Sequence, residues 1–273
     1  MVYITGDIHG DPNELIQFCR ANKLTEEDVI VILGDVGFNY YLNSRDNKVK
    51  YRVAQLSPTF FCIQGNHEER PQNINTYKTK EYRGAPVWYE EEYPNIVFAK
   101  DGEVYNFDGK KCMVIGGAYS VDKYWRLYRY FINNFLDIPM DIIDSLIDII
   151  NGVNIPTENR IKLDNFINTI DVNFGWFKDE QPSDDIKRFV ESQLMKYNYK
   201  IDCIFSHTCP SKYIPVEMFL SGINQDTVDN STEEWLDIID NKTEYNKWYC
   251  GHWHTDKKID KMEFLFHSIT NLK

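Results

Sequence analysis

Five of the six histidines in this chain lie in four short strings that also contain acidic, amide and glycine residues. The strings are residues 6–10 (GDIHG), 65–68 (GNHE), 206–208 (SHT) and 251–254 (GHWH), and residues 34–35 (GD) add a further carboxylate. Imidazole nitrogens combined with carboxylate and amide oxygens favour Mn, Fe, Zn, Co or Ni over Ca as the bound metal. Because these ligands come from five places along one chain, the pattern predicts a site for two transition-metal ions and indicates a metal-dependent hydrolase.

The spacing within the strings suggests how the ligands are shared. In a strand or extended turn, residues i and i+2 point to the same side. We therefore expect Asp7 and His9 to bind one ion together, and His252 and His254 to reach the same cavity side by side. Asp35 is the expected bridge, since a carboxylate can give one oxygen to each of two cations. Two ions about 3.5–4 Å apart can clamp a phosphoryl group and hold a bridging hydroxide for in-line attack.

Four of the five places follow a short apolar run that is typical of a buried strand. The runs are residues 2–4, 29–33, 59–63 and 201–205. Runs without polar alternation are typical of strands that are covered on both faces. Open α/β sheets build their sites at the carboxyl ends of strands, so the sequence predicts an α/β protein whose strands carry the site. Glycines 6, 34, 65 and 251 are expected to allow tight backbone turns beside the metals.

Other segments predict the elements that surround these strands. Helices are expected at about 12–20 and 182–197, and a capping-box signature at 231–234 predicts a helix through Asp240. Turn signals at 101–102 and 108–109 indicate a pair of hairpins. A late strand is expected at 264–266.

Helical periodicity from about 130 to 173 interrupts the strand pattern. Ile142, Leu146 and Ile150 share one face after Pro139, and a second apolar face follows Thr157. The sequence therefore predicts an inserted helical hairpin. A lid over the site is the preferred role for this insertion, and a dimer face is the alternative, so the oligomeric state stays open.

Composition restricts the remaining possibilities. The candidate ligands run from Asp7 to His254, and a shared site brings both ends of the chain together. We therefore expect a single domain over residues 1–273. The formal net charge of -12 argues against non-specific nucleic-acid binding. The most apolar stretch, 142–150, is too short to span a bilayer, and no signal peptide fits before the first strand, so we expect a cytoplasmic protein with no membrane contact. The six cysteines form no C-x-x-C pair and are expected to be mostly reduced core thiols.

The five strings, in this order, resemble the signature of the calcineurin-like metallophosphoesterases. That family's pattern is G-D-x-H, G-D, G-N-H-[DE], a lone His after a strand, and G-H-x-H, and it covers this chain except the insertion. The resemblance implies a four-layer α/β/β/α sandwich with a dinuclear metal site, Mn being the metal expected first. It also implies hydrolysis of phosphomonoesters or phosphodiesters by a metal-bridged hydroxide.

The resemblance also implies a role for each residue of the strings. Carried over by motif, the ligands of the first ion would be Asp7, His9 and His254, those of the second would be Asn66, His207 and His252, and Asp35 would bridge the two. His67 would not be a ligand but the acid that protonates the leaving oxygen, a role for which the pKa of imidazole is suited. Glu68 is expected either to support a ligand or to take part directly.

Departures from one branch of the superfamily bear on the substrate. Phosphoprotein phosphatases have G-D-x-x-D-R-G in the second block and an Arg before G-N-H-E, whereas this chain has Phe38, Asn39 and Gln64 at those positions. The missing groups would orient His67 and grip phosphate. Arg126 is the expected substitute, binding substrate together with Asn66, because Arg suits bidentate contacts to oxyanions. Lys123 and Arg70 are weaker candidates for the same role.

Three alternatives remain beside a phosphoesterase of this kind. A phosphoprotein Ser/Thr phosphatase-like enzyme is disfavoured by the departures just described. A non-catalytic scaffold with the same fold would be expected to have lost ligands, and no candidate position has lost its ligand. A mononuclear zinc hydrolase would leave several ligands unused. Residues 116–126 and 175–177 resemble a small bacterial and phage branch of the superfamily, for which the sequence assigns no substrate.

Overall fold

The computed structural model describes residues 1–134, 138–170 and 173–273. The predicted insertion at about 130–173 therefore includes two stretches, 135–137 and 171–172, that lie outside the described residues. The described residues form an α/β fold with two sheets, which confirms the predicted fold class.

The first sheet has the strand order β13-β1-β2-β3-β6-β5-β4. Its strands β1, β2, β3 and β6 are parallel to one another, while the β4–β5 hairpin and β13 add antiparallel edges. Three of the predicted apolar runs supply β1, β2 and β3, as their burial requires, whereas β6 was not predicted. The bounds are β1 (Val2–Thr5), β2 (Val29–Ile32), β3 (Thr59–Cys62), β4 (Lys78–Tyr82), β5 (Ala85–Tyr89), β6 (Ile96–Ala99) and β13 (Thr270–Asn271).

The second sheet has the order β11-β12-β10-β9-β8-β7; β12, β10, β9 and β8 are parallel, and β11 and β7 add antiparallel edges. Turn 108–109 closes the β7–β8 hairpin as predicted. Turn 101–102 does not close a hairpin, because it carries the chain from β6 in the first sheet to β7 in the second. The bounds are β7 (Val104–Phe107), β8 (Lys110–Ile115), β9 (Cys203–Ser206), β10 (Lys247–Cys250), β11 (Lys257–Ile259) and β12 (Met262–Phe264).

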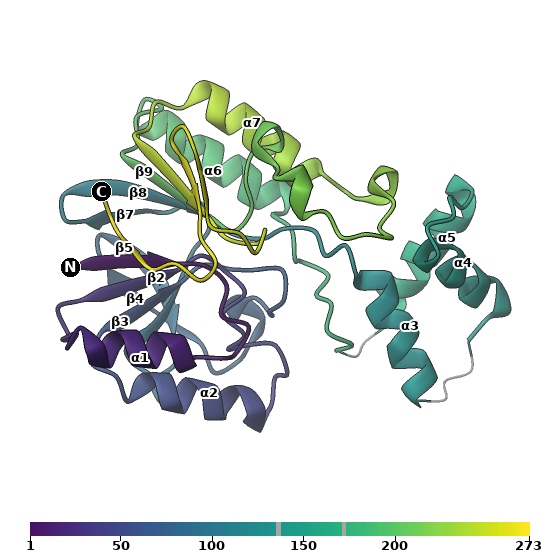
Figure 1. Cartoon of the computed structure of the whole chain (residues 1–273), viewed down its shortest axis with the longest axis horizontal. Helices are drawn as coiled ribbons and strands as arrows, with labels where there is room; N and C mark the ends of the chain where they lie inside the picture. The colour runs from purple at the N-terminus through teal and green to yellow at the C-terminus, as the bar shows by residue number, and fades with distance from the viewer. Residues whose placement is uncertain (135–137, 171–172) are drawn as a thin grey trace.

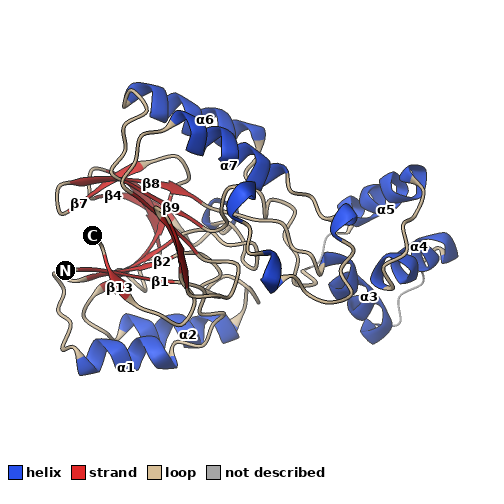
Figure 2. Ribbon diagram, turned by 45° about the horizontal axis from the view of Figure 1, so that its top comes forward, coloured by secondary structure: helices blue, strands red, loops and turns tan. Residues whose placement is uncertain are grey.

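Helices cover the outer faces of both sheets. Figure 2 shows α1 (Asn13–Ala21) and α2 (Ser44–Ala54) outside the first sheet, and α6 (Asp184–Lys196) and α7 (Ser231–Lys242) outside the second. Between the sheets lies a core of aromatic and β-branched side chains. It includes Val31, Phe61, Tyr105, Val114, Phe205 and Tyr249. This packing holds the carboxyl ends of strands from both sheets at one edge of the molecule.

Helix α7 begins at the predicted residue, but the predicted capping box does not form. The preceding Asn230 makes no side-chain cap, and Asp229 instead accepts a hydrogen bond from the backbone N–H of Ser231 at 3.0 Å. Glu233 points inward and accepts a hydrogen bond from the Thr208 hydroxyl at 2.8 Å. The first turn of α7 is therefore held by Asp229 and by the tertiary contact of Glu233 rather than by a capping box.

A helical segment, α3–α5, projects from the sandwich (Figure 1). Its helices are α3 (Lys123–Asn134), α4 (Met140–Ile150) and α5 (Thr157–Thr169), so it begins at Lys123 rather than at about 130 and has three described helices rather than two. The segment has its own small buried cluster, separate from the sandwich core, which includes Leu127, Phe131, Leu146 and Leu163.

The remaining described chain consists of loops and short 3-10 turns. These turns are η1 (Pro71–Asn73), η2 (Ser211–Tyr213), η3 (Val216–Met218) and η4 (Gln225–Thr227). All six cysteines are free and buried, which confirms the expectation of core thiols. Within the described ranges, no helix is long and apolar enough to cross a membrane.

Candidate metal centre

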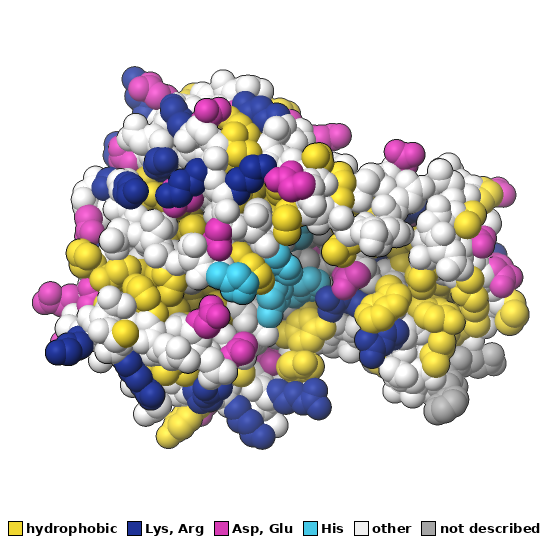
Figure 3. Space-filling view, viewed as in Figure 1, with side chains coloured by type: hydrophobic (Ala, Val, Ile, Leu, Met, Phe, Trp, Pro, Cys, Tyr) yellow, Lys and Arg dark blue, Asp and Glu magenta, His cyan; other side chains and the backbone are white. Residues whose placement is uncertain are grey.

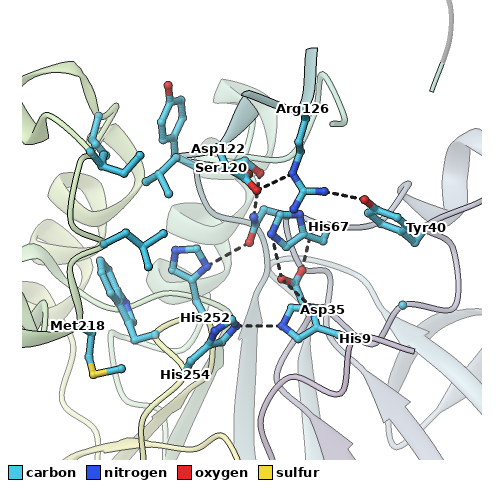
Figure 4. A pocket seen from close by; sticks show the side chains of 18 of the residues that line it. His9, Asp35, Tyr40, His67, Ser120, Asp122, Arg126, Met218, His252 and His254 are labelled. Atoms are coloured by element: carbon cyan, nitrogen blue, oxygen red, sulfur yellow. Dashed lines mark hydrogen bonds and ion pairs between the residues drawn. The ribbon is translucent and has the colours of Figure 1, made fainter. Parts of the chain in front are cut away.

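Loops that follow β1, β2, β3, β9 and β10 converge at one edge of the two sheets. A pocket of about 690 Å³ opens there, and Figure 4 shows the histidines and Asp35 pointing toward one another across it. Six of the predicted site residues line the pocket together with Arg126: His9, Asp35, Asn66, His67, His252 and His254. Asp7 and His207 lie buried behind them. The fold therefore brings every predicted ligand to one place.

The predicted ligands of the first ion form one group. Nε2 of His9 lies 2.9 Å from Nε2 of His254, and Oδ2 of Asp7 lies 3.5 Å from the latter and 3.9 Å from the former. Two ligands bound at about 2.1 Å and at right angles to each other would be about 3 Å apart. The spacing of these atoms thus fits a shared cation.

The predicted ligands of the second ion form a neighbouring group. Oδ1 of Asn66 lies 2.8 Å from Nε2 of His207 and 3.1 Å from Nδ1 of His252. Asp35 reaches both groups, with Oδ1 3.5 Å from Nε2 of His207 and Oδ2 4.0 Å from Nδ1 of His9. Potential donor atoms of Asp7, Asp35 and His207 also lie within 4.8 Å of one another, so Asp7 lies between the groups as well.

The ligands are not aimed by extended backbone, as the spacing argument supposed. His9, Asp35, His252 and His254 all have left-handed backbone, with φ of 45°, 47°, 63° and 48°. This conformation is uncommon outside glycine, costs free energy and clusters at functional sites where the surrounding structure enforces it. The side chains therefore converge because tight turns follow the strands, and the expectation of a strand-like i, i+2 arrangement is wrong.

Glycines make room for the carboxylates and for His207. A Cβ at Gly65 would lie 2.0 Å from Oδ1 of Asp35, and one at Gly251 would lie 2.3 Å from Oδ1 of Asp7. At Gly34, which alone of these three has left-handed φ, a Cβ would lie 2.1 Å from Nδ1 of His207. The predicted role in tight turns therefore applies to Gly34, whereas Gly65 and Gly251 are needed for close approach.

Backbone N–H groups fix the two carboxylates. The N–H of His67 donates to Oδ1 of Asp35 at 2.8 Å, and the N–H of His252 donates to Oδ1 of Asp7 at 3.0 Å. Charge-assisted bonds of this kind are short and strong, so they hold each oxygen in place. Both oxygens of Asp35, and Oδ2 of Asp7, also lie within 4.0 Å of a histidine nitrogen.

The protonation states favoured by the site suit divalent cations. Burial would raise the pKa of Asp35, but His207 and His67 oppose it, and the pKa of this carboxyl lies below its usual value. Burial, with His207 nearby, holds the pKa of His252 well below its usual range. The hydrogen bond to Asp7 raises the pKa of His254. Metals require ionised carboxylates and neutral imidazoles, and the donor set at Asp35 and His252 fits that requirement.

His67 lies in the pocket but takes a different position. Its Nε2 is 3.9 Å from Oδ2 of Asp35, and its side chain is 20% exposed. Its Nδ1 is buried and has no hydrogen-bond partner among the described residues, in keeping with the missing carboxylate of the second block. Burial lowers the pKa of His67, and Asp35 opposes that shift.

Arg126 lies beside His67 at the pocket (Figure 4). Its Nε donates to Oδ2 of Asp122 at 2.8 Å, and its Nη1 donates to the Tyr40 hydroxyl at 2.6 Å and to the carbonyl of Gly175 at 3.1 Å. Three parts of the chain thus hold the guanidinium. Asp122 and Tyr40 were missed at the sequence level. The i, i+4 spacing of Asp122 and Arg126 could have indicated the contact with Asp122. No local sequence signal indicated the contact with Tyr40.

The other two basic candidates do not reach the pocket. Arg70 is buried, with Nη1 donating to Oδ2 of Asp101 at 2.6 Å and Nε to the carbonyl of Asp179 at 2.7 Å. Nζ of Lys123 lies 3.4 Å from Oδ1 of Asp164. Neither residue lines the pocket, so both serve structural ion pairs.

The positions at which phosphoprotein phosphatases carry arginine point into the protein. Nε2 of Gln64 donates to the carbonyl of Glu68 at 2.7 Å, and Oδ1 of Asn39 accepts a hydrogen bond from the Tyr77 hydroxyl at 3.0 Å. Glu68 is fully buried and accepts the N–H of Gly65 at 3.1 Å, and burial and Asp35 raise its pKa to about 8. Glu68 therefore supports the loops and does not line the pocket.

A contact that orients the side chain of Asn66 was also missed from sequence. Nδ2 of Asn66 donates to Oγ of Ser120 at 2.9 Å, which turns the amide oxygen toward His207 and His252. The N–H of Ser120 donates in turn to Oε1 of Glu180 at 3.2 Å, and burial raises the pKa of Glu180 to about 7. The loop at 116–120 was noted in the sequence, but no local signal connects it with Glu180.

A family model described as calcineurin-like phosphoesterase matches residues 1–256. No curated protein matches the sequence significantly. Among solved structures, the phosphopantetheinyl hydrolase from Mycobacterium tuberculosis is similar, with a TM-score of 0.45 and 11% identity over 97% of this chain and 87% of that one.

Proposed function

Because this chain belongs to the calcineurin-like phosphoesterase family, and is therefore a metal-dependent phosphoric ester hydrolase, we propose that it works with two divalent transition-metal ions. The observation that carries this proposal is the position of Asp35. Its two oxygens face different histidines, His207 at 3.5 Å and His9 at 4.0 Å, as a bridging carboxylate requires. Asp7, His9 and His254 would hold the first ion, and Asn66, His207 and His252 the second. Mn is the metal we expect first, with Fe, Zn, Ni and Co as alternatives.

The bound ions would supply Lewis-acid charge to the phosphoryl oxygens and activate the attacking water. The chain's own residues do the rest. Arg126 lies at the pocket and can donate to a non-bridging phosphate oxygen, because no hydrogen bond of the described residues uses its Nη2. Its contacts to Asp122 and Tyr40 restrict the guanidinium, which reduces the entropy lost on binding phosphate.

His67 is the proposed proton donor to the leaving oxygen. Burial favours its neutral form, but a phosphate anion next to the ring would favour the protonated form, since a nearby opposite charge raises the pKa of an imidazole. The acid would therefore be formed chiefly when substrate is bound. Its partly exposed position at the pocket gives it access to the leaving group.

We further propose that residues 1–273 form one domain, with the helical segment as an insertion that reaches back to the site. Arg126 on α3 connects the segment to the pocket through Tyr40 and Gly175. A second contact joins Nδ2 of Asn224 to Oδ1 of Asn154 at 3.0 Å, between the loop near η4 and the turn before α5. These contacts support a lid rather than a dimer face.

Phosphodiesters are the preferred class of substrate. Gln64 and Asn39 point inward, so a doubly charged monoester would find fewer guanidinium contacts than in phosphoprotein phosphatases. A diester has one negative charge less and requires less compensation. We therefore expect diesters to be hydrolysed at least as well as phosphopeptides.

The test is a substrate panel assayed with Mn, Ni, Zn and Mg. It comprises p-nitrophenyl phosphate, bis-p-nitrophenyl phosphate, cyclic nucleotides, dinucleoside polyphosphates and a phosphopeptide, and it is repeated with Arg126→Ala. Arg188→Ala is the matched control, because Arg188 is an exposed arginine of α6 that forms a local ion pair. Phosphopeptide turnover ten-fold above that of every diester, lost in Arg126→Ala, would overturn the diester preference. No metal-dependent turnover of any ester would overturn the proposed activity.

A further inference from the structure

A second cleft adjoins the metal centre, between the 40–45 loop, α3 and residues 173–175. Its volume is about 720 Å³, and it shares Tyr40, Tyr41, Arg45 and Arg126 with the wall of the first pocket. Figure 3 shows Lys or Arg and hydrophobic side chains next to the histidines, where the sandwich meets the helical segment. Because the two cavities share a wall, a substrate bound at the candidate metal site could extend into this cleft.

Charge distinguishes the second cleft from the rest of the surface. Three arginines line it, Arg45, Arg126 and Arg129, and among the described residues no Asp or Glu does. The chain as a whole has 42 acidic and 30 basic residues, so this arrangement is local. Within the described ranges, Arg45 and Arg129 form no salt bridge. The cleft is therefore suited to an anionic group.

Aromatic side chains alternate with these arginines. Tyr41 is 48% exposed and Trp125 45% exposed, although large aromatics usually bury their rings. The Arg45 guanidinium lies 4.9 Å from the centre of the Tyr41 ring, and that of Arg129 lies 4.6 Å from the centre of the Trp125 ring. Exposed rings beside arginines are the surfaces on which nucleobases stack while their phosphates are bound.

Amide groups complete the lining. Asn133 is exposed in the same cleft, and its side-chain amide offers both a donor and an acceptor to the edge of a base. An acyl chain would need apolar walls without arginines, and a simple phosphate would need no aromatic rings. The combination of cation, ring and amide fits a nucleotide better than either.

We propose that this cleft binds the nucleotidyl part of a phosphodiester substrate, with its base against Trp125 or Tyr41 and its phosphate oxygens near Arg126 and Arg129. The proposal rests on the phosphodiesterase function above and names its substrate class. Water adds to phosphorus, the ester bond to the leaving oxygen breaks, and that oxygen takes a proton, so the products are a nucleoside monophosphate and an alcohol. No further reactant is needed.

The overall charge limits the length of such a substrate. A net charge of -12 repels a long polyanion beyond the cleft, because the sequence-independent part of nucleic-acid binding depends on extended Lys and Arg surfaces. The source of the nucleotidyl group is therefore expected to be a dinucleotide or the end of a short single strand. Assays with thymidine dinucleotide, a short oligothymidylate and a duplex of the same length distinguish these sources.

Two diesters with the same leaving group test the proposal. Thymidine 5′-(p-nitrophenyl phosphate) contains a nucleoside, whereas bis-p-nitrophenyl phosphate does not, and both release p-nitrophenol. The wild type should favour the nucleotidyl ester in kcat/KM, chiefly through a lower KM. Trp125→Ala and Arg129→Gln should each reduce the ratio of the two kcat/KM values by about ten-fold, as expected for one stacking or phosphate contact.

Controls are available on α2 and α6. Tyr51→Ala removes an aromatic residue that is 60% exposed, and Arg188→Gln removes an exposed arginine, both outside the two pockets. Both should leave the ratio at its wild-type value. Because Trp125 and Arg129 are also exposed, their substitution should not prevent folding.

A binding measurement gives a readout independent of turnover. The full-length protein is titrated into 1,N6-ethenoadenosine monophosphate in the presence of EDTA, and binding is followed by fluorescence anisotropy. The nucleotide should bind more weakly to Trp125→Ala and Arg129→Gln than to the wild type and both controls. Hydrolysis of bis-p-nitrophenyl phosphate with no preference for the nucleotidyl ester, or equal ratios in all variants, would overturn the cleft assignment alone. Absence of metal-dependent hydrolysis of both esters would instead count against the proposed function.

Discussion

The metal centre and the helical segment α3–α5 differ in how the chain holds them. At the candidate metal centre, buried strands from both sheets end in left-handed turns. Gly34, Gly65 and Gly251 lie so close to the ligands that a Cβ would not fit. The helical segment has a separate small core and leaves large apolar side chains such as Ile132, Met140 and Ile161 at least half exposed. Its connection to the pocket is made largely by Arg126.

This difference separates two tasks. Catalysis by metal ions needs ligands fixed to within fractions of an ångström, and rigid sheets provide such positions. Substrate choice needs a surface that can differ without disturbing the ligands, and an appended helical segment provides one. Changes in the sandwich should therefore affect metal binding, and changes in the segment should affect substrate use and local stability.

The largest effect is expected from Asp35→Asn. If Asp35 bridges two ions as proposed, losing its charge should release both ions, reduce the metal content from about two per chain, and abolish turnover. Metal content by inductively coupled plasma mass spectrometry and hydrolysis of bis-p-nitrophenyl phosphate check this outcome. Asp184→Asn, an exposed aspartate of α6, is the control. One tightly held ion in the wild type, unchanged in Asp35→Asn, would refute a dinuclear centre.

His67→Ala should separate catalysis from metal binding. Loss of the proposed acid is expected to reduce turnover of alkyl esters by about 10²–10⁴-fold, while nitrophenyl esters, whose leaving group needs little protonation, are affected less. Metal content should stay close to that of the wild type. Equal losses on both kinds of ester would argue against the acid role, and loss of an ion would make His67 a ligand.

Gly65→Ala tests whether close packing positions the bridge. Because the added Cβ would lie 2.0 Å from Oδ1 of Asp35, the carboxylate must move. We expect metal affinity to fall by about 10–100-fold, as for other changes that misplace a ligand, which equilibrium dialysis with Mn measures. Gly84→Ala is the control, since Gly84 has open space at its Cβ, and its left-handed φ of 89° adds only local backbone strain. Similar affinities in both variants would remove the steric argument.

The smallest effect on metal binding is expected from Leu146→Ala. This side chain is fully buried in the cluster of the helical segment, and its truncation should destabilise the segment by about 2–5 kcal/mol. Hydrogen exchange should increase in α4 while metal content is retained. Leu33→Ala, equally buried but next to Gly251 in the sandwich, is the matched variant and should weaken metal binding. Loss of metal in both would show that the two regions are not separable.

Elements with strong patterns were predictable from sequence, and elements without them were not. The apolar runs that form β1, β2, β3 and β9 mark buried strands directly. Helix α2, with the sequence SRDNKVKYRVA, has few apolar residues and was missed, because its buried residues include Asp46 and Lys50 beside Val53. Burial of Lys50 depends on Glu90, whose Oε2 lies 2.5 Å away on a distant part of the chain. Such a partner has no local signature.

The sequence by itself determined which residues gather at the pocket, since residue type, order and position after an apolar run were enough to identify Asp7, Asp35, His207 and the other candidate ligands. The tertiary structure decided what surrounds them. It alone brings Tyr40 and Gly175 to Arg126, turns Gln64 inward, and opens the arginine and aromatic cleft beside the metals. The physical reason is the distance along the chain over which each effect acts. Strand and turn preferences act between neighbours in the chain, whereas these contacts join residues that only packing brings together.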